Sequence, residues 1–227
     1  MPSFSHGLVL VSLLLTTGCS LSDGRDEVAT RLRVAAVAEQ SGQGDVALSL
    51  YEAAAQQAPS RPEVQRRYAG ALLEHGQPDQ AIEVLQNALQ RNAGDPGLLA
   101  EAGRAQLALG QAEAALVTYQ ALLRKAPQNV AALNGQGVAL DLLGRHGEAQ
   151  QSYGAAQAVS PGNVAAANNL ALSTLLEGRA AAAAMLFSVL DRPGVPERVR
   201  QNHAVARAAA GEAVENPLAQ TLGSALR

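Results

Sequence analysis

The fold is decided by the stretch GQAEAALVTY, residues Gly110 to Tyr119, because its punctuation returns along the chain at a fixed interval. The opening glycine recurs at one constant spacing, at Gly42, Gly76, Gly110, Gly144 and Gly178. A small residue follows the same step (Ala47, Ala81, Ala115, Ala149, Ala183), and so does a bulky one (Tyr51, Leu85, Tyr119, Tyr153, Phe187). Three series in one register predict an array of repeats.

Each repeat carries the signals of two helices joined by a turn. Glycine adopts the left-handed conformation that ends a helix at little steric cost, so the glycine series marks the end of each first helix. The alanines let paired helices approach closely, and the bulky residue four positions later fills the space beside them. Side chains that suit the N-cap of the next first helix also recur, at Asp95, Asn129 and Asn163. We therefore expect an all-α solenoid.

This pattern resembles the tetratricopeptide repeat, a helix-turn-helix unit whose length, about 34 residues, is the spacing of the glycines. The resemblance implies a repeat domain over residues 28–211, with about five full repeats and a partial sixth. The first helix of the sixth repeat is expected at about Glu197 to Ala210, and Gly211 comes one residue early, which predicts one deletion in the preceding linker. Residues 212–227 are expected to cap the open end of the stack, with three leucines spaced four apart at Leu218, Leu222 and Leu226.

The amino terminus reads as a lipoprotein signal peptide over residues 1–18. The apolar run Gly7 to Leu15 is too short to span a bilayer, which takes roughly 20 residues. The only cysteine follows it, and Leu15-Thr16-Thr17-Gly18-Cys19 resembles a bacterial lipobox. That resemblance implies cleavage before Cys19, lipidation of its thiol, and a polar tether over residues 19–27. The alternative is an ordinary secretory signal with an incidental cysteine.

The residue after the cysteine predicts which of the two bacterial membranes holds the protein. In the lipoprotein signals that this stretch resembles, Asp at that position favours retention at the inner membrane, and this chain has Ser20 instead. We therefore expect a location in the inner leaflet of the outer membrane, facing the periplasm, with membrane contact through the lipid anchor only. Several acyl chains give stable anchoring where one does not.

Composition and motifs argue against several function classes. Lys and Arg number 17 against 20 Asp and Glu, a formal net charge of −3, which disfavours nucleic-acid binding. We find no nucleophile elbow, phosphate-binding glycine loop or H-E-x-x-H motif. The four histidines fall at different phases of the repeat and are expected to be solvent-exposed, at His6, His75, His146 and His203. The sequence predicts a protein-binding module with no catalytic, metal or cofactor site and no small-molecule substrate.

A candidate binding surface follows from the repeat register. In tetratricopeptide stacks the first helices line the concave face, and four asparagines fall there, at Asn134, Asn168, Asn169 and Asn202. Because an asparagine amide both donates and accepts, we predict that they line a peptide-binding groove and pair with a peptide backbone. The alternative is that they bond only neighbouring repeats. The family's carboxylate clamp is not reproduced, although Arg66, Arg67 and Arg104 supply positive charge.

Two segments carry a more specific likeness: Asn168 to Arg179, and Val195 to Ala206 with Gly211. They resemble the TadD-like tetratricopeptide lipoproteins of the tight-adherence (Tad/Flp) pilus machinery, although His203 stands where leucine is usual. The resemblance implies an assembly factor that holds the secretin or an associated pilus subunit in its groove. Two alternatives are a type IV pilus secretin pilotin and a periplasmic adaptor that recruits cell-wall hydrolases or proteases.

Overall fold

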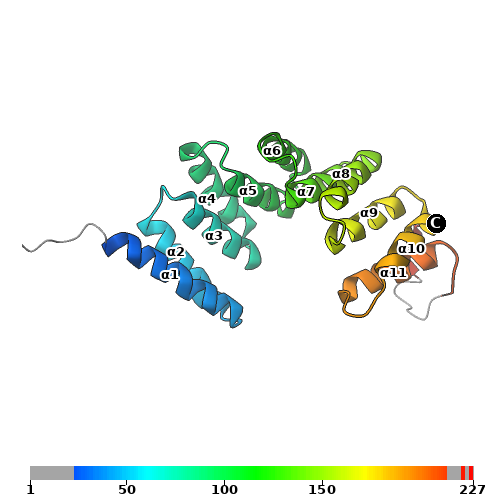
Figure 1. Ribbon diagram of the computed structural model, residues 1–227, viewed down its shortest axis with the longest axis horizontal. Coiled ribbons are helices and arrows are strands. Elements are labelled where there is room, and N and C mark those ends of the chain that lie inside the picture. The colour runs from blue at the N-terminus through cyan, green and yellow to red at the C-terminus, as the bar shows by residue number, and fades with distance from the viewer. Residues whose placement is uncertain (1–22, 214–220, 223–224, 227) are drawn as a thin grey trace, which may run out of the picture.

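The computed structural model describes residues 23–213, 221–222 and 225–226, and in that part of the chain every regular element is helical (Figure 1). The signal peptide, Cys19 and Leu218 lie outside the described residues. Eleven helices follow one another within residues 23–213: α1 (Asp23–Gln40), α2 (Gly44–Gln57), α3 (Pro62–Glu74), α4 (Pro78–Arg91), α5 (Pro96–Ala108), α6 (Ala112–Lys125), α7 (Val130–Leu142), α8 (His146–Val159), α9 (Val164–Leu176), α10 (Ala180–Leu190) and α11 (Glu197–Ala209).

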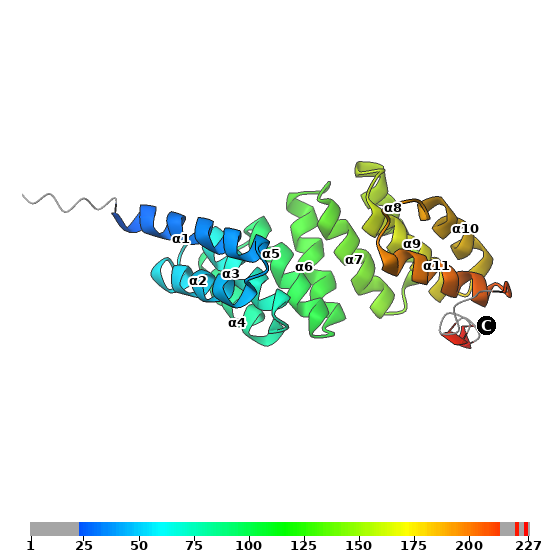
Figure 2. The same cartoon turned by 90° about the horizontal axis from the view of Figure 1, so that it is seen from below.

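The helices pair in sequence order and stack into an elongated arch (Figures 1 and 2). Each odd-numbered helix packs against the even-numbered helix that follows it, and α3, α5, α7, α9 and α11 also pack against one another in succession. The first helices therefore form one continuous face, while α6 and α8 lie on the outer side of the bend in Figure 1. This arrangement confirms the predicted all-α solenoid of helix-turn-helix repeats.

The turn glycines adopt the predicted left-handed conformation. Gly76 has a φ of 69° and Gly110 a φ of 70°, and neither position could take an L-residue with a side chain without strain. Gly211 also has a positive φ, and the interval from the start of α9 to the start of α11 is one residue shorter than the glycine spacing, which confirms the one-residue deletion. Gly94 and Gly194, which lie outside the repeating glycine series, also have positive φ values, 75° and 87°, in the linkers before α5 and α11.

The predicted N-caps are also confirmed. The carboxylate of Asp95 accepts a hydrogen bond from Leu98 N at 2.9 Å. The side-chain amide oxygens of Asn129 and Asn163 accept equivalent bonds from the backbone N–H three residues later, at 2.9 and 2.8 Å. Each bond satisfies one of the backbone donors that a helix start leaves without an intrahelical partner, so these side chains fix where α5, α7 and α9 begin.

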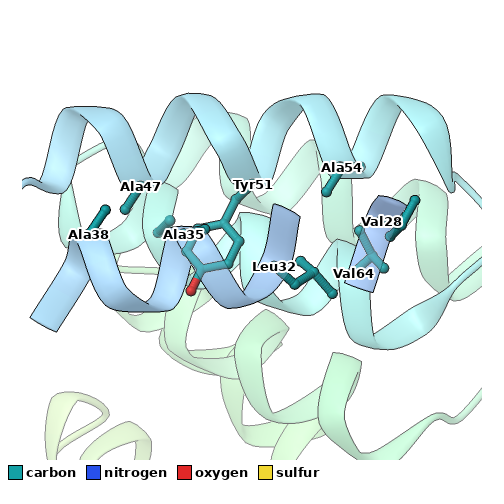
Figure 3. Packing of buried hydrophobic residues seen from close by; sticks show 10 residues of the cluster. Val28, Leu32, Ala35, Ala38, Ala47, Tyr51, Ala54 and Val64 are labelled. Carbon is teal, nitrogen blue, oxygen red and sulfur yellow. The ribbon is translucent and has the colours of Figure 1, made fainter. Parts of the chain in front are cut away.

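Small residues and one large side chain per repeat build the core. Ala47, Ala81, Ala115, Ala149 and Ala183 are at most 2% exposed, as are most of the bulky residues four positions later. Figure 3 shows the first repeat, where Tyr51 extends from α2 toward α1 beside Ala35. In the third and fourth repeats the tyrosine ring lies against a glycine: a Cβ added at Gly103 would come within 2.6 Å of the Tyr119 ring. The glycines make room for these rings.

The first helix begins before residue 28, the predicted start of the repeat domain. Helix α1 begins at Asp23, so it includes the second half of the predicted tether. An ion pair of 2.7 Å between Arg31 and Glu27, one helical turn apart, and a hydrogen bond of 2.7 Å from Arg31 to Gln57 support this extension. At the other end, the side chains of Leu222 and Leu226 are 47% and 42% exposed, so the capping role of the tail stays a prediction.

Candidate functional site

The four predicted asparagines lie together and bond to one another on the face formed by the first helices. Asn202 Nδ2 donates to Asn168 Oδ1 at 3.0 Å, Asn168 Nδ2 donates to Asn169 Oδ1 at 3.1 Å, and Asn169 Nδ2 donates to Asn134 Oδ1 at 3.0 Å. We call this set the asparagine chain. It runs from α11 through α9 to α7, and each asparagine donates to the next member in that order.

The geometry corrects the register of the last member. Because α11 starts one residue early relative to α9, Asn202 is equivalent to Asn169 and not to Asn168. Counted from the start of each first helix, Asn134 and Asn168 are at the fifth position, and Asn169 and Asn202 are at the sixth. In both inter-repeat bonds the sixth-position asparagine donates to the fifth-position asparagine of the previous repeat. These residues therefore bond neighbouring repeats, and a role in peptide binding stays a prediction.

The asparagine chain leaves unused hydrogen-bonding capacity. Each side-chain amide has two N–H groups, and each of the three bonds in the asparagine chain uses one N–H group of its donor. Among the described residues, Asn134 Nδ2 at one end and Asn202 Oδ1 at the other have no partner. Asn168 is only 6% exposed, whereas the other three members are half-buried and reach solvent. The internal bonds hold the outer amides in fixed orientations, which lowers the entropy that a bound backbone would cost them.

A second polar cluster, which was not predicted from the sequence, joins the same repeats. The Asp141 carboxylate accepts hydrogen bonds from the Ser173 hydroxyl at 2.7 Å and from the Tyr153 hydroxyl at 2.9 Å, and its Oδ1 lies 2.8 Å from His146 Nδ1. Burial and the nearby carboxylate raise the pKa of Tyr153. One carboxylate thus ties α7, α8 and α9 together. Spacing alone gave no signal for it, because its members come from different phases of the repeat.

The histidines are not solvent-exposed as predicted. His75, His146 and His203 are half-buried, and each lies near a carboxylate. His203 also stacks on Phe187, with ring centroids 6.3 Å apart. The prediction failed because each of these residues lies beside a turn or faces the adjoining helix, where a partner is close. His6 is outside the described residues. Within the described part of the chain, no group of three or more metal-ligating side chains gathers.

The three basic residues singled out on the concave face, Arg66, Arg67 and Arg104, lie beside acids. Arg104 pairs with Glu101 at 2.7 Å, and Arg66 approaches the same carboxylate at 4.0 Å. Arg67 pairs with Glu63 at 3.3 Å. These contacts use the positive charge of the three arginines locally. Nearby, burial raises the pKa of the Tyr119 hydroxyl to about 12, so this ring stays neutral at physiological pH.

Replacing one asparagine should destabilise the protein at least as much as replacing all four. Replacing Asn168 by Ala strands the amides of Asn169 and Asn202 and should lower the free energy of unfolding by about 1–3 kcal/mol. Replacing all four removes both partners of every bond and should cost no more than the single change. Urea unfolding of the two variants and the wild type measures this. A loss in the quadruple variant of several times the single loss would contradict the bonding pattern.

The fold is a solenoid of helix-turn-helix repeats like that of solved tetratricopeptide-repeat structures. Residues 38–86 and 72–136 match a family model described as a tetratricopeptide repeat. Two thirds or more of the chain superposes on solved structures of low sequence identity. TTC0263, a tetratricopeptide-repeat protein of Thermus thermophilus, has 24% identity and a TM-score of 0.69, with 79% of this chain and 98% of that chain covered.

Two further structures show the same fold. PilF of Pseudomonas aeruginosa has 12% identity and a TM-score of 0.69, with 90% of each chain covered. MamA of Desulfovibrio magneticus has 19% identity and a TM-score of 0.62, with 73% of this chain and 93% of that chain covered. No curated protein matches the chain in sequence. At these identities the likeness is one of fold.

Among the described helices, none has the length and apolar character that crossing a membrane requires.

Proposed function

We propose that this chain is an outer-membrane lipoprotein that binds another protein during assembly of the tight-adherence (Tad/Flp) pilus. The observation that carries the binding role is the asparagine chain, a row of pre-oriented amides on the inner face of a repeat stack. A backbone segment laid along this face would find donors and acceptors at regular intervals, whatever its side chains. Such a surface suits a scaffold, since none of its groups is set up for proton transfer or nucleophilic attack.

The pilus role is supported by the likeness of the last two repeats to the TadD-like lipoproteins. The residues that carry that likeness include three members of the asparagine chain, Asn168, Asn169 and Asn202. The bound partner is then the secretin or an associated subunit. Anchoring through Cys19 would place the repeats in the periplasm, where such a subunit passes on its way to the outer membrane.

Cross-linking in the native membrane tests the partner directly. A photoreactive amino acid in place of Gln201, which is exposed beside Asn202 on α11, should capture the secretin or a pilus subunit after irradiation. The same amino acid at Val117, exposed on α6, is the matched control and should not. Capture of a cell-wall hydrolase or protease at Gln201 would favour the adaptor alternative and contradict the pilus role.

A further inference from the structure

The first helices lie furthest apart at one place. Successive first helices from α3 to α11 pack against each other, whereas the backbones of α1 and α3 are more widely spaced, although Val28, Leu32 and Val64 share one buried cluster between them. A cleft of about 570 Å³ lies between them. Its floor is aliphatic, formed by Ala29, Leu32, Ala36 and Val37 of α1. Val37 is 62% exposed, so apolar surface remains uncovered there.

The rim of this cleft is strongly basic. Its lining includes three guanidinium groups, from Arg33, Arg61 and Arg67, and one carboxylate, that of Glu63. Glu63 is paired with Arg67. Arg33 donates only to the neutral Thr30 hydroxyl at 3.0 Å, and no described carboxylate forms an ion pair with Arg33 or Arg61. The Nε of Arg67 is buried and has no partner among the described residues. Such a buried donor costs free energy until an acceptor reaches it.

We propose that this cleft binds an acidic, apolar segment of a partner polypeptide. Apolar side chains would cover the floor from Ala29 to Val37, and carboxylates would pair with Arg33 and Arg61 at the rim. The cleft lies between first helices, the same set of helices that carries the asparagine chain further along the stack. This inference rests on the proposed function. One extended segment of the partner would be recognised through its side chains at α1–α3 and held through its backbone at α7–α11.

Three fluorescent decapeptides distinguish the required chemistry. One alternates leucine with glutamate, one alternates leucine with lysine, and one alternates serine with glutamate. Fluorescence anisotropy with the purified protein should show binding of the leucine–glutamate peptide at least tenfold tighter than of the other two, weakening as salt rises. Equal binding of the glutamate and lysine peptides, or no binding of any peptide at millimolar concentration, would overturn the proposal. Binding of phosphatidylglycerol vesicles but not of the peptide would also overturn it.

Charge reversal locates the site. The double variant Arg33→Glu/Arg61→Glu should weaken the leucine–glutamate peptide at least tenfold. It should fold normally, because Arg61 caps α3 without a side-chain bond and an acidic residue suits a helix start. Arg192→Glu, a single charge reversal at an exposed position at the far end of the stack, should leave binding unchanged. Equal loss in both variants would exclude the cleft as the site.

The same peptide separates this inference from the proposed function. If the quadruple asparagine variant loses the peptide and the arginine variant keeps it, the cleft proposal fails and the asparagine surface stands. If the arginine variant loses the peptide while cross-linking at Gln201 recovers no pilus subunit, the cleft stands and the pilus role fails.

Discussion

Replacing Gly135 by Ala should destabilise the protein by about 1–3 kcal/mol, and Gly137→Ala by a similar amount. Both glycines lie within α7, where alanine is ordinarily the better helix former. A Cβ at Gly135 would overlap the ring of Tyr119, and one at Gly137 would overlap the ring of Tyr153. These rings are 3% and 1% exposed and are enclosed by neighbouring helices, so they have no free space into which to move. Urea unfolding measures the loss.

A matched pair of glycines in the next helix provides the control. Gly147 and Gly154 are exposed in α8, and an added Cβ at either would meet nothing within 4 Å. Alanine at these positions should stabilise the protein by up to about 1 kcal/mol through helix propensity alone. If the α7 substitutions also stabilise the protein, the tyrosine rings do not pack against these glycines as described.

Replacing Cys19 by Ala should move the protein from the membrane to the soluble periplasmic fraction. The acyl chains on that residue are expected to be the only attachment, and losing several chains removes essentially all of the affinity for the bilayer. Fractionation and metabolic labelling with a radioactive fatty acid measure the change. Unchanged membrane fractionation without any loss of label would contradict lipidation at Cys19.

A neighbouring substitution tests the choice of membrane separately. Ser20→Asp should keep the lipid label but shift the protein to the inner membrane on a sucrose gradient, because Asp after the lipidated cysteine favours retention there in the signals this stretch resembles. A variant that remains in the outer-membrane fraction would contradict the predicted sorting while leaving the anchor in place.

Local signals in the sequence were sufficient to predict the backbone of this fold. Turn glycines such as Gly110 and caps such as Asn129 act within a few residues of their own position, so their spacing reports helix ends directly. The buried alanines and Tyr119 follow the same register because each repeat meets the same neighbours as the last. The one-residue deletion before α11 was visible for the same reason, since it displaced a glycine that the turn requires.

Pairings between repeats could not be predicted in the same way. The bond from Asn169 to Asn134 joins residues 35 apart, one more than the repeat length, and depends on how neighbouring helices are rotated. The Asp141 cluster combines side chains from three helices, so no single spacing marks it. The spread between α1 and α3, which forms the cleft, is likewise a property of packing and has no local signal.

Surface pili in three strains test the central claim most directly, that the inner face of this stack binds a component of the pilus apparatus. The gene is deleted and then replaced by the wild type or by the variant with Ala at Asn134, Asn168, Asn169 and Asn202. Our account predicts few pili and reduced secretin in the deletion strain, full recovery with the wild type, and a deletion-like count with the anchored, folded variant. Normal pili in the deletion strain would contradict the pilus role. Few pili in the deletion strain together with normal pili in the variant strain would contradict binding by the asparagine chain.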